Sequence, residues 1–258
     1  MSEDLRRAFA LIASGDMGGV RTEPSRFGLA VFDEGLPLRY DSNYLLVDEL
    51  PEAVSVDDLA AEAGRLDRPA IMVRHERTGE RLAPGFQRLG WTIHRGLVMA
   101  HRRRPARSAD TGRAEEVDEA ALRPARRRLL AGEPWATPAL VEQLLDAKLG
   151  IARTMATRFF AVRVDGQVAS YVDLYHDGRA AQIEDLATLP EHRGRGYASA
   201  LVLRALQEAR RAGCDLVFLV ADAEDWPKAL YGRLGFVELG RYVKLMRLGR
   251  LDRGPSPR

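Results

Sequence analysis

The sequence predicts an α/β fold built from two related halves. In the second half, a strand-like run stops at Pro190, a glycine-rich turn follows, and an amphipathic helix continues from Ala198. The continuous apolar run 216–220 is typical of a fully buried strand. The segment Phe-Gln-Arg-Leu-Gly-Trp at 86–91 is echoed by Tyr-Gly-Arg-Leu-Gly-Phe at 231–236, and an apolar strand follows each. We interpret this echo as a repeat, although two short turns can also coincide.

Hydrophobic periodicity places the elements of the first half. We expect helices at 4–13 and 56–66 and strands near 27–32, 44–47 and 70–74. A closing hairpin is expected from 91 to 100. Residues 105–117 carry Pro105 and Gly112 and are interpreted as a linker between the halves.

The second half is expected to begin with two helices, at 119–130 and 138–155. Pro124 leaves open whether the first helix begins only there, because proline suits a first helical turn. A hairpin follows, with strands at 159–164 and 167–175 and a turn at Asp165-Gly166. A further strand spans 179–189, and Gly213 closes the helix after the glycine-rich turn.

The turn Arg193-Gly194-Arg195-Gly196-Tyr197-Ala198 opens that helix. A helix N-terminus presents unpaired backbone N–H groups at its positive end, and glycine lets a bulky anion approach the backbone. The turn therefore predicts a diphosphate ligand. The alternative is an idle turn, since many loops use glycine only to change direction.

The spacing Arg193-x-x-Gly196-x-Ala198 resembles the coenzyme A loop of the GNAT superfamily of N-acetyltransferases. Downstream, Leu230-Tyr231-x-x-x-Gly235-Phe236 resembles the end of the short helix of that family. The resemblance implies two GNAT-like domains, each a mixed, mostly antiparallel sheet flanked by helices. Residues 1–104 would be a degenerate copy without a cofactor loop, 118–249 the acetyl-CoA-binding domain, and 250–258 a flexible tail.

The resemblance also implies the site. Acetyl-CoA would be the acyl donor, and its diphosphate would lie on the turn. Tyr231 would donate a proton to the leaving sulfur, and Glu184 would accept the amine proton, with Asp185 or a water as alternatives. Because neighbouring strand residues face opposite sides, only one of the two carboxylates is expected to point into the cleft. The expected cofactor-binding residues are Leu186, Ala187, Thr188, Arg193, Gly194, Arg195, Gly196, Tyr197 and Ala198.

The sequence departs from the family pattern at several positions. Glu224 and Pro227 stand where many members have Asn-x-x-Ala, which puts one coenzyme A contact in doubt. In the first half, Phe86 matches Tyr231 but has no hydroxyl, and 50–54 has neither glycine nor a basic residue. We therefore expect the first half to bind no cofactor and to serve as a wall of the substrate cleft.

Composition narrows the class of protein. The net charge is +2, no stretch approaches the ~20 apolar residues of a membrane span, and no signal-peptide pattern begins the chain. The single cysteine, Cys214, and the five histidines show no metal-ligand spacing, so no metal is expected. The arginine runs 102–104 and 126–128 are interpreted as solvated. A cytoplasmic protein that binds neither nucleic acid nor membrane is expected, and a homodimer stays open.

The predicted function is the direct transfer of an acetyl group from acetyl-CoA to a primary amine of a small molecule or peptide. The alternative within the same resemblance is a non-catalytic acyl-CoA-binding sensor, against which the retained Tyr231 argues. A structural or nucleic-acid-binding module would have to use the arginine runs, and the balanced net charge argues against it.

Overall fold

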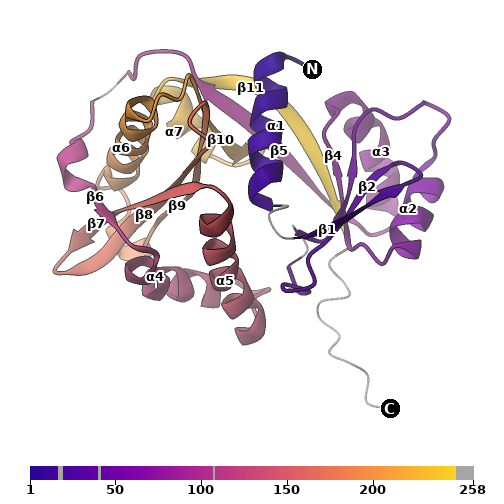
Figure 1. Cartoon of the computed structure of the whole chain (residues 1–258), viewed down its shortest axis with the longest axis horizontal. Coiled ribbons are helices and arrows are strands. Elements are labelled where there is room, and N and C mark those ends of the chain that lie inside the picture. The colour runs from indigo at the N-terminus through magenta and orange to yellow at the C-terminus, as the bar shows by residue number, and fades with distance from the viewer. Residues whose placement is uncertain (17–19, 40–41, 107, 248–258) are drawn as a thin grey trace.

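The computed structural model describes residues 1–258 except 17–19, 40–41, 107 and 248–258 (Figure 1). The expected tail at 250–258 lies outside the described residues. The first half contains the helices α1 (Glu3–Asp16), α2 (Val56–Arg65) and α3 (Glu76–Arg88). Its strands are β1 (Arg21–Ser25), β2 (Gly28–Phe32), β3 (Tyr44–Val47), β4 (Ala70–Val73) and β5 (Thr92–His101).

The second half contains the helices α4 (Glu119–Ala131), α5 (Pro138–Thr154), α6 (Tyr197–Arg211) and α7 (Pro227–Arg233). Its strands are β6 (Glu115–Val117), β7 (Ala156–Val164), β8 (Gln167–His176), β9 (Ala180–Thr188), β10 (Leu216–Asp222) and β11 (Phe236–Met246). Two short 3₁₀ helices, η2 (Thr111–Arg113) and η3 (Pro190–His192), complete the order.

All strands belong to one 11-stranded sheet with the order β1-β2-β3-β4-β11-β5-β10-β9-β8-β7-β6. Among the described strands, only β3–β4 and β9–β10 pair in parallel, so the mixed, mostly antiparallel arrangement that the sequence predicts is confirmed. The two halves share their last strands. The strand β5 of the first half lies between β10 and β11, and β11 of the second half lies between β4 and β5. Neither half therefore completes its sheet alone.

Helices cover both faces of this sheet. On one face α1 packs on Val98 and Phe218, and α4 packs on Phe159. On the other face α6 packs on Leu97 and Leu219, while α2 and α3 cover β3, β4 and β11. Because neighbouring strand residues point to opposite faces, Leu97 and Val98 enter different cores. The cavity described below is lined by α1, α4 and α5 of one face and by α7 and the start of α6, which pack on the other.

The internal repeat is visible in the structure. In both halves a helix ends at a leucine, a glycine with positive φ follows (Gly90, +77°; Gly235, +94°), and a strand begins shortly afterwards. Phe86 and Trp91 form an edge-to-face pair with ring centroids 4.9 Å apart, and Tyr231 and Phe236 form the equivalent pair at 6.3 Å. The echo is therefore a structural correspondence and not a coincidence of turns.

In the first half and the linker, two expectations differ from the structure and one helix was not expected, and glycine explains the helix and the hairpin. The helix α3 was not predicted because Gly79, Pro84 and Gly85 interrupt its pattern; a Cβ at Gly85 would overlap Val56 of α2. The expected hairpin at 91–100 is the single strand β5, in which a Cβ at Gly96 would overlap the ring of Tyr242. The expected linker contains η2 and β6, and β6 pairs with β7.

The N-cap of α4 shows where the first helix of the second half begins. The helix α4 begins at Glu119, because the side chain of Asp118 accepts a hydrogen bond from the backbone N–H of Ala121. Pro124 lies inside α4 and not at its start.

Candidate active site

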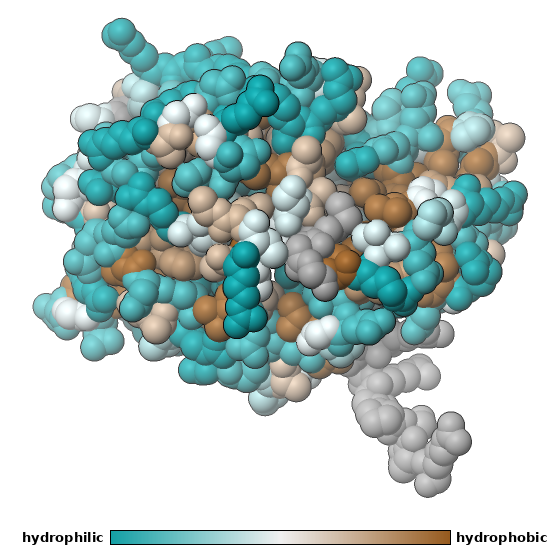
Figure 2. All heavy atoms as spheres, in the orientation of Figure 1, coloured by the Kyte–Doolittle hydropathy of each residue, from teal (hydrophilic) through white to brown (hydrophobic). Residues whose placement is uncertain are grey.

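A cavity of about 1120 Å³ is lined by α1, α4, α5, α7 and the start of α6. It begins at the glycine-rich turn 193–198, passes the carboxyl end of β9, and reaches Phe9 of α1 and Lys244 of β11. Both halves of the chain line it. Figure 2 shows hydrophobic side chains exposed across the middle of this side of the molecule, within a largely hydrophilic surface.

The glycine-rich turn 193–198 forms one end of the cavity. Gly194 and Gly196 have φ of +76° and +78°, and a Cβ at either would meet only open space. Glycine is therefore favoured here by the left-handed backbone and not by crowding. Gly196 caps α6 without a side-chain hydrogen bond, so the first N–H groups of α6 face the turn without an intrahelical acceptor. This arrangement fits a diphosphate.

Beside the turn, β9 and β10 separate. They pair in parallel up to Ile183 and Leu219, and beyond that register no described strand pairs with the β10 side of residues 184–188. A second hollow of about 190 Å³ lies in this gap, bordered by Leu186, Val220 and Tyr231. The free edge of β9 carries backbone groups that can bind an extended ligand. Leu186, Ala187 and Thr188 also line the large cavity.

A bulge at Asp185 brings two carboxylates to the same face of the sheet. Asp185 has φ of +53°, and the register between β8 and β9 shifts between Tyr171 and Asp173. An inserted residue breaks the alternation of side chains along a strand. Both Glu184 and Asp185 therefore line the large cavity, and the expectation that only one could do so is wrong.

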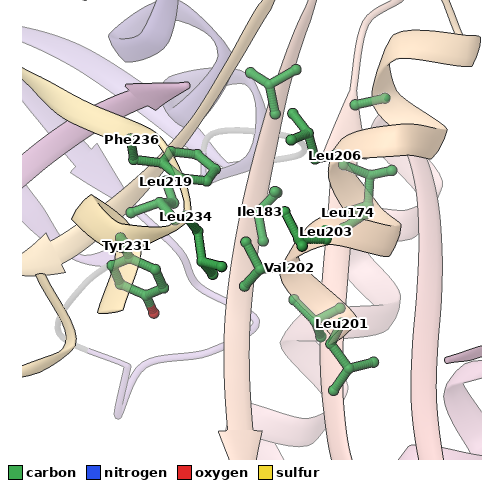
Figure 3. Close-up of a cluster of buried hydrophobic side chains, with 14 of the residues drawn as sticks. Leu174, Ile183, Leu201, Val202, Leu203, Leu206, Leu219, Tyr231, Leu234 and Phe236 are labelled. Atoms are coloured by element: carbon green, nitrogen blue, oxygen red, sulfur yellow. The ribbon is translucent and has the colours of Figure 1, made fainter. Parts of the chain in front are cut away.

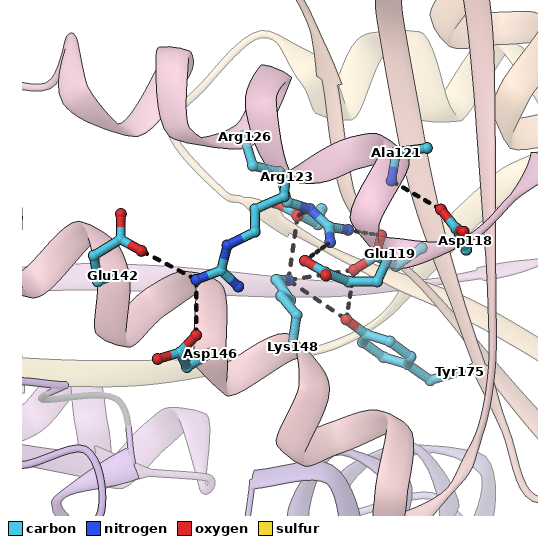
Figure 4. Close-up of polar contacts among 11 residues, drawn as sticks. Asp118, Glu119, Ala121, Arg123, Arg126, Glu142, Asp146, Lys148 and Tyr175 are labelled. Atoms are coloured by element: carbon cyan, nitrogen blue, oxygen red, sulfur yellow. Dashed lines mark hydrogen bonds and ion pairs between the residues drawn. The ribbon is translucent and has the colours of Figure 1, made fainter.

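Asp185 belongs to a buried ion-pair network. The guanidinium of Arg126, 2% exposed, donates from Nε to Asp185 Oδ2 at 3.0 Å and also pairs with Asp173. The Lys148 ammonium lies 3.3 Å from Asp185 Oδ2 and 3.4 Å from Asp173 Oδ2. The Tyr175 hydroxyl donates to Asp173 Oδ2 at 2.6 Å. Figure 4 shows Arg126, Lys148 and Tyr175 converging from α4, α5 and β8.

The interpretation of the run 126–128 as a solvated face is therefore wrong for its first residue. Arg126 faces the sheet, whereas Arg127 and Arg128 are 47% and 60% exposed and pair with Glu142 and Glu191. Three consecutive helical residues point in different directions, so one of them can be buried while its neighbours stay in water.

The pKa shifts assign different states to these groups. Burial alone would lower the pKa of Lys148, but the charges of Asp185 and its neighbours outweigh it, and the pKa lies well above the usual value. Lys148 therefore stays a cation. Burial raises the pKa of Glu184, and Lys148 opposes this only in part. Glu184 accepts a hydrogen bond from Gln182 Nε2 at 2.7 Å. Its raised pKa suits a group that accepts a proton during the reaction.

Tyr231 lies on α7 at the gap between β9 and β10. Its ring packs in the core beside Phe236, and its hydroxyl points away from Leu219 and Leu234 (Figure 3). Burial and the charge of Glu184 raise the pKa of Tyr231 to about 12. The hydroxyl therefore keeps its proton near neutral pH and can donate it.

The two departures from the family pattern take structural roles. Pro227 is the first residue of α7, where its missing N–H costs no hydrogen bond. Glu224 accepts a hydrogen bond from Arg95 of β5 at 3.1 Å and thereby ties the loop before α7 to the first half of the chain.

Sequence reasoning missed Lys148, Tyr175 and Gln182 as parts of the site. One signal was present: the chain has only three lysines among 39 basic residues, and two of them, Lys148 and Lys244, line the cavity. Within the described residues, no group of three or more His, Cys, Asp or Glu side chains could hold a metal ion, and no helix is long and apolar enough to cross a membrane.

Comparison with protein-family models identifies the part of the chain that carries the turn, the gap and Tyr231. Residues 116–236 match the acetyltransferase (GNAT) family. These residues form a GNAT domain. A stretch of 57 residues, 22% of this chain, is 44% identical to the N-alpha-acetyltransferase MAK3 of Arabidopsis thaliana. That match spans only 30% of the plant protein.

Solved structures extend the similarity of fold to both halves. A GCN5-related N-acetyltransferase from Kribbella flavida superposes with a TM-score of 0.63 over 95% of this chain and 96% of that one, at 18% identity. A conserved protein of unknown function from Staphylococcus epidermidis gives 0.67 over 88% of this chain and 93% of that one, also at 18% identity. At this identity the likeness concerns the fold, and it includes the first half of the chain.

Proposed function

We propose that this GNAT domain transfers an acetyl group from acetyl-CoA to a primary amine of a small molecule or peptide. The observation that carries the proposal is the continuity of one cavity. It joins the N-terminus of α6, which has no side-chain cap, to Tyr231 and Glu184, so a diphosphate on the turn and a reacting acyl group at the gap fit one ligand. Bound acetyl-CoA would supply a thioester as the activated acyl group.

Each residue of the site has a distinct task in this proposal. The backbone of 193–198 binds the diphosphate, and the free edge of β9 at 186–188 binds the extended arm and polarises the acyl carbonyl. Glu184 accepts the proton that the amine loses, directly or through a water. Tyr231 gives its proton toward the departing sulfur.

Asp185 is less suited than Glu184 to act as the base. Arg126 and Lys148 both contact its carboxylate, so Asp185 Oδ2 is already engaged in two ion pairs. We assign it to holding Lys148 and Arg126 in place. A sensor that binds acyl-CoA without turnover has no need of the Glu184–Tyr231 pair.

The test of cofactor binding uses two glycines with the same backbone. Gly196 and Gly166 both have φ of +78°, and a Cβ at either meets open space. Gly196→Asp is expected to weaken acetyl-CoA binding by roughly tenfold or more, because a carboxylate replaces the attraction of the helix end by repulsion. Gly166→Asp, in the turn between β7 and β8, carries the same backbone strain and is expected to bind like the parent.

Isothermal titration calorimetry with acetyl-CoA measures both variants. Equal affinity of the folded Gly196→Asp variant and the parent would show that the diphosphate does not lie on the turn. Equal weakening in both variants would trace the loss to backbone strain and would also overturn the assignment.

A further inference from the structure

The large cavity continues past Glu184 into an apolar chamber between the two halves. This acceptor chamber is lined by Phe9, Ile12 and Gly15 of α1, Ile151 and Met155 at the end of α5, and Tyr242 of β11. The diphosphate turn lies at the opposite end of the cavity. The chamber is therefore space that the acyl donor, bound at the turn and the gap, leaves for the acceptor.

Most of the chamber walls are apolar and pack against the core, and Lys244 of β11 also lines this end of the cavity. Phe9 and Tyr242 form an edge-to-face pair with centroids 6.0 Å apart. Ile12 and Met155 pack against the same core cluster but stay only half-buried, so part of each side chain faces the cavity. Apolar surface left facing a cavity gains free energy when an apolar ligand covers it.

The inner end of the chamber is polar. Glu184 and Asp185 line the cavity there, beside the cations Arg126 and Lys148. Asp185 pairs with both cations, whereas Glu184 accepts a hydrogen bond from Gln182, so an amine that reaches this end can hydrogen-bond to Glu184. A ligand with an amine at one end and an apolar body therefore complements both parts of the chamber.

We propose, building on the acetyl transfer proposed above, that the acceptor is a primary amine carried on an aromatic or branched aliphatic body. The amine lies at Glu184, and the body fills the acceptor chamber between α1 and α5. The first half of the chain, which lacks a cofactor loop, thus selects the substrate. Polycationic, highly hydroxylated amines such as aminoglycosides do not match these walls.

Gly15 offers a direct way to fill the chamber. A Cβ at Gly15 would lie 3.5 Å from Met155 Cε and 3.9 Å from Ile151 Cγ2, so Gly15→Ala adds a methyl in ordinary contact and Gly15→Leu projects further into the chamber. Gly64 is the matched control. Like Gly15, it is the penultimate residue of its helix, and a Cβ there meets open space outside the cavity.

The experiment compares 2-phenylethylamine with ethylamine, which share the ammonium group and differ in the apolar body. Thiol release from acetyl-CoA gives kcat/KM for each amine, and calorimetry gives binding of each amine to the protein alone. For the parent, kcat/KM is expected to be at least about tenfold higher for 2-phenylethylamine, since even one methylene in an apolar pocket discriminates by about that factor. Gly15→Leu is expected to erase this preference, Gly15→Ala to reduce it, and Gly64→Leu to keep it.

The outcomes separate this inference from the proposed function. Turnover of both amines without preference, or equal behaviour of Gly15→Leu and Gly64→Leu, would overturn the acceptor chamber while acetyl transfer stands. Gly15→Ala decides the matter should Gly15→Leu fail to fold. If no amine is acetylated by the parent, the proposed function itself fails, and the inference falls with it.

Discussion

Replacing Tyr231 with Phe is expected to lower kcat by about 100- to 10,000-fold, the usual contribution of a positioned general acid. The hydroxyl points into the gap between β9 and β10, and a pKa of about 12 keeps it protonated. Its hydrogen bond to sulfur strengthens as charge develops, so its loss affects turnover more than acetyl-CoA affinity. Steady-state thiol release at saturating amine measures kcat, and calorimetry measures the affinity.

Tyr44→Phe is the matched control for this substitution. Tyr44 is 3% exposed on β3 and does not line the cavity, so its variant is expected to keep the kcat of the parent. The ring and its edge-to-face contact with Phe236 survive in Tyr231→Phe, and the melting temperature should barely change. Unchanged turnover in that variant, with chemistry shown to be rate-limiting, would reduce Tyr231 to a packing residue.

Replacing Glu184 with Gln is expected to lower kcat/KM by about 100- to 10,000-fold and to alter its pH dependence. A base must be unprotonated to act, and burial raises the pKa of Glu184 above that of an ordinary glutamate. The activity of the parent is therefore lost as the pH falls through this raised pKa. In Glu184→Gln this acid limb of the pH profile of kcat/KM, which Glu184 sets, disappears. Only the titration of the amine substrate then shapes the profile.

Asp185→Asn distinguishes the two neighbouring carboxylates. It removes a partner of Arg126 and Lys148, so it is expected to reduce stability, yet the acid limb set by Glu184 should remain in the profile. If Asp185→Asn removes the limb and Glu184→Gln keeps it, Asp185 is the base and the roles proposed for the pair are reversed.

The parts of the site that are contiguous in the chain could be predicted from the sequence. The turn 193–198 and the helix end at Tyr231 depend on local backbone geometry and on motifs of a few residues, and the structure places both at one cavity. The repeat was visible for the same reason, because the glycine and aromatic residues at its two helix ends are local signals.

The features that depend on distant contacts could not be predicted. The exchange of β5 and β11 is a matter of pairing between strands far apart in the chain, and Gly96 resembles a turn until Tyr242 is placed against it. The burial of Arg126 depends on Asp173, which is 47 residues away. The bulge at Asp185 reverses the alternation on which the choice between the two carboxylates was based.

The central claim is that one cavity holds acetyl-CoA and an amine so that the acetyl group passes directly between them. Incubation of the protein with acetyl-CoA and 2-phenylethylamine, followed by quantification of free thiol and by mass spectrometry of the amine, tests it most directly. The account predicts equal amounts of thiol and N-acetylated amine, with both strongly reduced in Tyr231→Phe. Tight binding of acetyl-CoA without any acetylated amine, across aromatic, aliphatic and peptide acceptors, would contradict it and indicate a protein that senses acyl-CoA.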